Sequence, residues 1–407
     1  MLIKRELYLK KIRAFYDVDL IKVLTGVRRS GKSILLTQIR DEFIEKGIER
    51  DHIIEINFED IAFEKIRTAQ KLNTYIKKRI KDKGKYYIFL DEIQHVRSFE
   101  KTLSSLRATI NCSIFVTGSN SKILSGRLAT LLTGRCIEFR IMPFTFAESI
   151  EYLNSIGKQA DPYNFISDYL NWGGMPLRFS FEKEGDVKNY LEQTYRGIID
   201  KDIVTERSRI SRQDFNQIAD YVMANAGKEF SSTNIKNFFD SVNEVELDKK
   251  KIYRYLDKLE KACLINRVKK YNIVGKEALK YTEKQYAVDS GFRMINTNLV
   301  NYEDSFFLEN IIYNELITRG YQVFTGKTYK GEVDFVVIDG KKKCFIQAAY
   351  LLASKETIQR EFGAFGPISD AAPKYVMSLD RIDFSRDGIG HINIVDFLMG
   401  KTDISLN

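Results

Sequence analysis

The chain has 407 residues, of which 44% are hydrophobic and 29% charged, and its formal net charge is +9. This length exceeds one ordinary core, so we expect a soluble globular protein of about two to four domains. We expect no membrane partner, because no apolar run reaches the about 18 residues of a membrane span and no signal peptide is evident. The four cysteines are widely spaced and form no C-x-x-C pair, which argues against a zinc site and favours a cytoplasmic location.

The first informative segment joins a β-prone apolar run at residues 20–25 to residues 33–40, whose apolar positions have helical spacing. The connection fits G-x-x-x-x-G-K-[ST] at every fixed position: Gly26, Val27, Arg28, Arg29, Ser30, Gly31, Lys32 and Ser33. Strand, glycine-rich loop and helix predict a phosphate site, in which backbone N–H groups and the helix N-terminus face a nucleotide such as ATP. Lys32 is expected to neutralise phosphate charge, and the Ser33 hydroxyl to ligate Mg²⁺. The alternative is a glycine turn before an ordinary helix.

Two carboxylates follow a second apolar segment. Residues 86–90 are all apolar and predict a central strand that is buried on both faces. Asp91 and Glu92 come directly after it, at the strand end where open α/β sheets bind their ligands. Asp91 is suited to hold Mg²⁺, and Glu92 to orient and deprotonate an attacking water. The pair could instead cap a helix.

A third strand is predicted at residues 113–117, and polar residues follow it. Ser119 or Asn120 would lie between the carboxylates and the γ-phosphate, and could sense whether that phosphate is present. The same residues could also cap the next helix, which we expect at 121–132. Arg135 precedes a further strand predicted at 136–141.

Several blocks resemble the bacterial and archaeal AAA-superfamily ATPases with an AAA+ core and a C-terminal domain of uncharacterised function. These are T-G-V-R-R-S-G-K-S, F-L-D-E-I-Q, T-G-S-N-S-K-I-L-S, L-T-G-R and M-P-F-T-F-A-E, within residues 25–148. The resemblance implies an ATPase core with Glu92 as the catalytic carboxylate. It also implies that Arg135, with Arg127 as runner-up, occupies the place of an arginine that reaches a neighbouring subunit's γ-phosphate; a structural salt bridge is the alternative.

The middle of the chain is expected to be mostly helical. The resemblance marks residues 147–213 as a helical lid. Residues 214–290 predict a winged helix, with a helix near 249–263 whose basic face includes Lys258 and four predicted phosphate contacts, Lys249, Lys250, Lys251 and Arg254. Such a helix can enter the major groove of duplex DNA, and winged helices also serve as protein interaction modules.

Residues 291–407 resemble the restriction-endonuclease-like fold. Glu309 and Asp334 match the acidic pair that holds a metal in active members of that fold. Gln347 replaces the usual third acid, and Ala349 stands where a lysine is expected. We therefore predict a degenerate domain without nuclease activity, unless a displaced lysine such as Lys327 rescues the site.

The sequence thus predicts an α/β protein. A P-loop parallel sheet of the AAA+ type (1–146) is followed by a helical lid (147–213), a winged helix (214–290) and an endonuclease-like domain (291–407). The favoured function is a Mg²⁺-dependent ATPase that acts as a switch for a DNA- or protein-binding C-terminal half, alone or as a homo-oligomer. The alternatives are an ATP-regulated nuclease and a slowly hydrolysing signalling or assembly protein. A kinase is disfavoured, because the paired carboxylates suit water activation.

Overall fold

The computed structural model describes two compact units. One runs from Leu2 to Met142 and the other from Pro143 to Asn407; we call them the N-terminal and the C-terminal unit. The described residues exclude 1–2, 119–133, 205–209, 242–247, 298–303 and 330, and the side chains of 280–283 and 304–306. Each unit has a sheet of its own.

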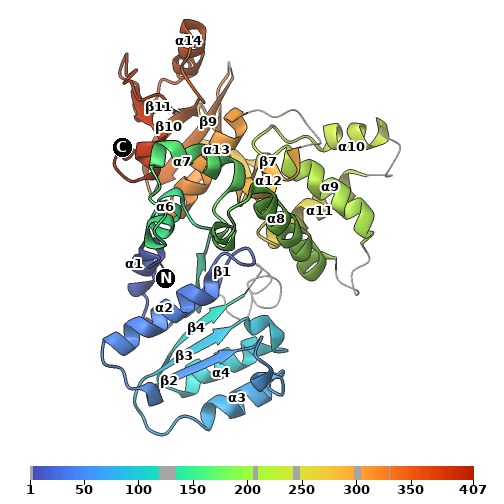
Figure 1. Ribbon diagram of the computed structural model, residues 1–407, viewed down its shortest axis with the longest axis vertical. Coiled ribbons are helices and arrows are strands. Elements are labelled where there is room, and N and C mark those ends of the chain that lie inside the picture. Colours follow the sequence, from blue (N-terminus) through green and yellow to red (C-terminus); the bar gives the residue numbers. More distant parts are fainter. Residues whose placement is uncertain (1–2, 119–133, 205–209, 242–247, 298–303, 330) are drawn as a thin grey trace. The chain divides into compact units, whose positions relative to one another are not determined.

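The N-terminal unit is built on a five-stranded parallel sheet with the strand order β2-β3-β4-β1-β5 (Figure 1). Its strands are β1 (Ile21–Thr25), β2 (Ile53–Asn57), β3 (Tyr86–Asp91), β4 (Cys112–Thr117) and β5 (Cys136–Arg140). Every residue of β1 and β3 is buried, as expected for strands that are covered on both faces. The predicted P-loop-type parallel sheet is confirmed.

Helices cover both faces of this sheet. On one face, α1 (Glu6–Arg13) and α2 (Lys32–Glu45) bury Leu9 and Ile39 against Phe89 of β3 and Phe115 of β4. On the other face, α3 (Ala69–Lys77) and α4 (Phe99–Thr109) pack against a second cluster that includes Ile88. Because helices cover both faces, loops lie at the two ends of the strands.

The C-terminal unit begins with a helical segment. Thr145 starts α6 with a capping box, since its hydroxyl accepts from the Glu148 N–H while the Glu148 carboxylate accepts from the Thr145 N–H. The helices are α6 (Phe146–Ser155), α7 (Pro162–Trp172), α8 (Glu184–Ile198), α9 (Arg212–Ala224), α10 (Ser232–Ser241), α11 (Lys249–Lys261) and α12 (Ser290–Met294). None of the described helices combines the length and the apolar character that a bilayer crossing requires.

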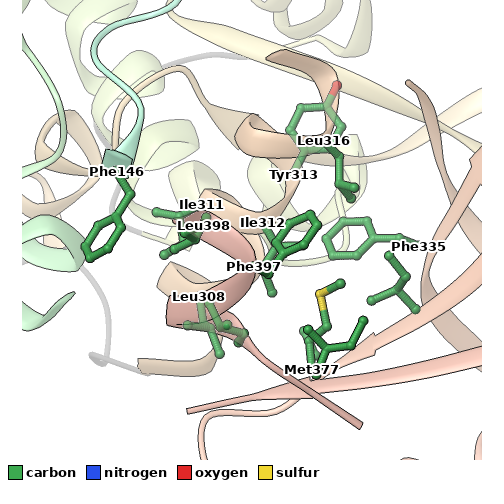
Figure 2. Packing of buried hydrophobic residues seen from close by; sticks show 14 of the residues in the cluster. Phe146, Leu308, Ile311, Ile312, Tyr313, Leu316, Phe335, Met377, Phe397 and Leu398 are labelled. Carbon is green, nitrogen blue, oxygen red and sulfur yellow. The ribbon is translucent and has the colours of Figure 1, made fainter. Parts of the chain in front are cut away.

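A seven-stranded sheet completes this unit, in the order β12-β11-β10-β9-β8-β6-β7. Its strands and adjoining helices are β6 (Ile265–Asn272), β7 (Glu277–Ala287), α13 (Asp304–Arg319), β8 (Gln322–Lys327), β9 (Glu332–Asp339), β10 (Lys342–Ala348), α14 (Lys355–Gly363), β11 (Lys374–Ser378), β12 (Gly390–Asn393) and α15 (Ile394–Leu398). Figure 2 shows its main core, in which Phe146 of α6 belongs to the same cluster as Leu308, Phe335 and Phe397.

One sheet crosses the predicted boundary at residue 290. The hairpin β6–β7 lies on the predicted winged-helix side, yet β6 pairs in parallel with β8 from the endonuclease-like side. Helix α6 of the predicted lid likewise shares a core with α13 and α15. The C-terminal unit therefore has one continuous sheet. Its division into lid, winged-helix and endonuclease-like domains stays a prediction.

Candidate functional site

The loop between β1 and α2 has backbone conformations that require glycine at two positions. Gly26 has φ +140°, and a Cβ there would lie 2.2 Å from the Ile141 carbonyl oxygen. Gly31 has φ +94° and is the N-cap of α2. A larger residue would clash at the first position and be strained at the second. Both fixed glycines of the sequence pattern thus have a structural reason.

The loop curls around the Lys32 side chain. Its ammonium group donates to the carbonyl oxygens of Gly26 at 3.1 Å and Val27 at 2.9 Å, and the residue is 4% exposed. The first N–H groups of α2 have no partner within the helix, so they offer donors and partial positive charge at the same place. The buried Ser30 hydroxyl oxygen has no hydrogen-bond partner among the described residues. These donors fit the phosphates of a nucleotide.

Arg5 supports the phosphate loop through hydrogen bonds, a role that the sequence did not predict. Its guanidinium donates to the carbonyl oxygens of Ser30 at 2.9 Å and Met142 at 3.0 Å, and lies 4.7 Å from the centre of the Tyr8 ring. The Tyr8 hydroxyl in turn accepts from the Met142 N–H at 3.0 Å. Arg5 therefore joins the phosphate loop to the last residue of the N-terminal unit.

Asp91 and Glu92 lie at the end of β3, where the sequence placed them. Both are buried, and Glu92 has φ +54° and ψ +48°. This left-handed conformation costs a non-glycine residue about 1–3 kcal/mol and persists only where neighbours fix it. Thr117 at the end of β4 is such a neighbour, because its hydroxyl donates to the Asp91 carboxylate and accepts from the Glu92 N–H at 2.9 Å. Thr117 was not predicted.

The surroundings of Glu92 suit a proton acceptor. Burial raises the pKa of its carboxyl above the usual range, while the nearby charge of Lys32 opposes that shift. The Gln94 side-chain amide donates to one Glu92 oxygen. Ligand atoms of Glu59 and His95 lie within 4.8 Å of each other and of Glu92. The carboxylate thus faces several polar groups that the sequence analysis did not bring together.

The strand order separates the loop from the carboxylates by one strand. Since β4 lies between β1 and β3, the ends of β1 and β3 are about 10 Å apart. That gap can hold phosphates and a hydrated cation between Lys32 and Asp91. Ser33 is exposed at the start of α2, so its hydroxyl can join Asp91 as a Mg²⁺ ligand.

The remaining predicted residues divide into two groups. Arg28 is half-buried and Arg29 is exposed with φ +67°. Ser119 and Asn120, together with Arg127, lie outside the described residues, so their predicted roles stay predictions.

Arg135 is exposed, and its carbonyl oxygen accepts from the Ile21 N–H at 2.9 Å. Ile21 pairs with Cys136 at the start of β1, whereas the phosphate loop follows the end of β1. With a rise of about 3.3 Å per residue, Arg135 and Gly26 are roughly 20 Å apart. Arg135 therefore lies at the opposite sheet edge from its own phosphate loop.

Comparisons with known proteins agree with this geometry. The sequence profile of an AAA domain matches residues 19–150, and that of a domain of unknown function matches residues 164–302. An uncharacterised protein of Haemophilus influenzae is 33% identical over 402 residues, which are 98% of this chain and 99% of that protein. The chain belongs to this family of AAA-superfamily ATPases.

Two further similarities extend the picture. An uncharacterised protein of Methanocaldococcus jannaschii is 29% identical to this AAA-superfamily member over 388 residues, covering 92% of this chain and 85% of the relative. The solved structure of a Walker-type ATPase of Pyrococcus abyssi aligns with a TM-score of 0.50 and 17% identity, over 72% of this chain and 96% of that one. The structural likeness supports the P-loop fold.

In the C-terminal unit of this AAA-superfamily protein, the predicted acidic pair does come together. The Glu309 carboxylate on α13 and the Asp334 carboxylate on β9 both face the ammonium group of Lys284, at 3.0 and 3.6 Å. Lys284 belongs to β7 and was not considered from the sequence. Lys327, the displaced lysine suggested by the sequence, is exposed at the end of β8, and Ala349 is buried.

The basic face of α11 is only partly free. Lys249, Lys250 and Arg254 are exposed. The Lys251 ammonium group instead lies 2.6 Å from the Asp214 carboxylate on α9. Three of the four predicted cations therefore face solvent, and the fourth joins two helices.

Proposed function

We propose that the protein binds ATP and hydrolyses it with Mg²⁺. The observation that carries this proposal is the shared sheet edge of the Lys32 loop and the Asp91–Glu92 pair, with Thr117 between them. A phosphate-binding loop alone would serve binding; a buried carboxylate of raised pKa beside it adds a group that can accept a proton.

Each residue has a proposed task. The loop N–H groups from Gly26 to Ser33 and the Lys32 ammonium bind the phosphates. Ser33 and Asp91 would hold Mg²⁺, which when bound neutralises phosphate charge. Glu92 orients the attacking water and takes its proton on a carboxylate oxygen. Ser119 and Asn120 are proposed to contact the γ-phosphate.

Arg135 is proposed to act on a neighbouring copy of the chain. It lies at the strand edge opposite its own loop, so it cannot reach the γ-phosphate that this loop would bind. An arginine placed by a second copy would stabilise the charge of the transferred phosphoryl group. This proposal makes the protein a homo-oligomer when nucleotide is bound.

We further propose that nucleotide state controls binding by the C-terminal unit. The exposed cations Lys249, Lys250 and Arg254 on α11 support duplex DNA as the partner, as does the net charge of +9. The alternative is a protein partner. Binding that depends neither on salt nor on these cations would favour that alternative.

The first experiment separates binding from hydrolysis. We expect Lys32→Ala to weaken ATP binding strongly, since the loop loses the ammonium group at its centre. Glu92→Gln should bind ATP but turn it over about 10²–10⁴-fold more slowly, the usual cost of losing a general base. Nucleotide binding by fluorescence and phosphate release measure the two effects.

Matched controls lie in the same unit. Lys46→Ala changes a lysine at the other end of α2, and Glu55→Gln changes an exposed glutamate on β2. Both should behave as the parent. Turnover at the parent rate in Glu92→Gln would show that Glu92 is not the base, and unaltered ATP binding in Lys32→Ala would refute the proposed nucleotide site.

A further inference from the structure

A buried cluster of charges in the C-terminal unit lies at the place where the endonuclease-like resemblance expects a metal. Glu309 comes from α13, Asp334 from β9 and Lys284 from β7, and none is more than 9% exposed. The lysine ammonium lies 3.0 Å from Glu309 Oε2 and 3.6 Å from Asp334 Oδ1. The two carboxylates that would share a cation thus already share one.

The position of Lys284 is fixed by the strand that carries it. Two residues further along β7, on the same face, the Tyr286 hydroxyl donates to Glu309 Oε2 at 3.2 Å. The Tyr286 ring stacks on Tyr313 of α13, with 4.5 Å between ring centres. The Asn310 side chain also exchanges two hydrogen bonds of 2.8 Å with the Ala287 backbone. These contacts hold β7 against α13 next to the cluster.

Asp334 and Gln347 make further hydrogen bonds with the backbone around the cluster. Asp334 Oδ2 accepts from the Ala348 N–H at 2.9 Å, and the Asp334 N–H donates to Gln347 Oε1 at 3.3 Å. Gln347, which replaces the usual third acid, therefore binds the backbone of β9. Next to the cluster, Lys270 of β6 pairs with the Glu332 carboxylate of β9. The residues do not fit a resident divalent cation.

An ammonium group and a metal ion cannot both occupy this position. Carboxylate oxygens bind divalent cations at about 2.0–2.6 Å, so a metal between Glu309 and Asp334 would overlap the lysine nitrogen. Moving Lys284 away would leave its charge in a buried environment without its two partners, which is costly. The lysine thus excludes the metal by both space and charge.

We propose that Lys284 serves as a built-in cation in place of a metal, so that the C-terminal unit binds no divalent cation at Glu309 and Asp334 and cuts no nucleic acid. The pairing of β6 with β8 joins the hairpin β6–β7 to the sheet, and the two ion pairs of Lys284 connect β7 to α13 and β9. Removing the lysine uncovers a latent metal site between the two carboxylates.

The test compares the full-length parent with Lys284→Met, which keeps length but removes charge. We expect the variant to have a lower Tm without metal, because two buried carboxylates lose their cation. Mn²⁺ should raise that Tm, since a ligand at 100 times its Kd shifts the folding equilibrium about 100-fold. In the parent, by contrast, Mn²⁺ should not bind between Glu309 and Asp334. Any change of the parent Tm in Mn²⁺ should therefore be the same in Asp334→Asn. Tb³⁺ gives a local readout, because Tyr286 beside Glu309 can sensitise its luminescence.

Two controls make the result specific. Lys284→Met combined with Asp334→Asn should lose both the Mn²⁺ stabilisation and the luminescence. Lys270→Met removes an equally buried lysine of the same sheet and should be destabilised without recovery in Mn²⁺. If Lys284→Met does not fold even in Mn²⁺, Lys284→Gln is measured in its place.

Three results would overturn the proposal. One is Mn²⁺ or Tb³⁺ binding by the parent that disappears in Asp334→Asn. Another is metal-dependent DNA cleavage that disappears in Asp334→Ala but persists in Lys32→Ala, which would make Lys284 a displaced catalytic lysine. The third is the failure of metal to stabilise either Lys284→Met or Lys284→Gln.

Discussion

Replacing Thr117 by valine should damage turnover more than nucleotide binding. The substitution keeps the shape of this fully buried side chain and removes only its hydroxyl. That hydroxyl donates to the Asp91 carboxylate and accepts from the Glu92 N–H. Without it, the two residues that we assign to Mg²⁺ and to water activation lose their shared support.

The size of the effect follows from these two hydrogen bonds. A buried N–H without a partner costs about 1–3 kcal/mol, and a hydrogen bond to a charged group contributes a similar amount. We therefore expect the free energy of unfolding to fall by about 2–6 kcal/mol. A domain whose free energy of unfolding is in the usual range of about 5–15 kcal/mol stays folded after such a loss over most of that range. Misplacement of a catalytic group by about 1 Å can cost 10²-fold, so kcat should fall by roughly 10–100-fold.

The assay measures ATP turnover, ATP binding and thermal unfolding on the same preparations, below the Tm of each variant. Binding should change little, because the proposed phosphate contacts come from residues 26–33, which the substitution leaves unchanged. Thr117→Ser retains the hydroxyl and should recover most of kcat. Thr102→Val is the stability control, since this buried hydroxyl donates to the Ala69 carbonyl oxygen at 2.7 Å, away from the site.

Either of two results would refute the role assigned to the Thr117 hydroxyl. In the first, Thr117→Val keeps the parent kcat, so that the hydroxyl is not needed to hold Asp91 and Glu92. In the second, Thr117→Ser loses as much kcat as valine does. Equal loss of kcat in Thr102→Val would show that reduced stability alone explains the effect.

For Arg135, mixing Arg135→Ala chains with Glu92→Gln chains should restore part of the ATPase activity through composite sites; no recovery between chains that do associate would contradict a role on the neighbour. For DNA, Lys249→Gln, Lys250→Gln and Arg254→Gln should each lower the salt slope of duplex binding by about one, whereas Lys251→Gln should mainly destabilise, and an unchanged slope would favour a protein partner. For pH, burial lowers the pKa of Lys22 to about 8, so the folded state binds fewer protons than the unfolded state above that pH. The free energy of unfolding of the parent should therefore rise relative to Lys22→Met as pH increases from about 8 to 10; a constant difference in urea titrations would contradict this.

The local patterns of the N-terminal unit were readable from the sequence. Residues 26–33 and the pair Asp91–Glu92 are contiguous segments, and each follows a strand whose apolar run identifies it. Contiguity is what makes such sites visible, because the chemistry and the strand end lie within a few residues. The sequence does not single out Thr117, because a threonine at the end of a β-prone run resembles any other strand residue. Its function arises only from the neighbouring position of β3 and β4.

The residues that were missed are defined by long-range contacts. Arg5 meets Ser30 across 25 positions and Met142 across 137. Lys251 was expected to face DNA, and its pairing with Asp214 depends on how α9 and α11 pack. Lys284 reaches Glu309 only because the hairpin β6–β7 joins the sheet of β8–β12. Periodicity reports which face of an element is buried, but it does not report which side chain lies opposite.

The two edges of the N-terminal sheet constrain how copies of this chain could cooperate. The phosphate loop and the carboxylates follow the ends of β1 and β3, whereas Arg135 precedes the start of β5. If Arg135 completes a neighbour's site, the interface joins one edge of the first copy to the opposite edge of the second. Such a head-to-tail contact uses two different surfaces, so it repeats into a ring or a filament rather than closing as a two-fold dimer. An arginine that is inert in its own site would then make hydrolysis depend on assembly.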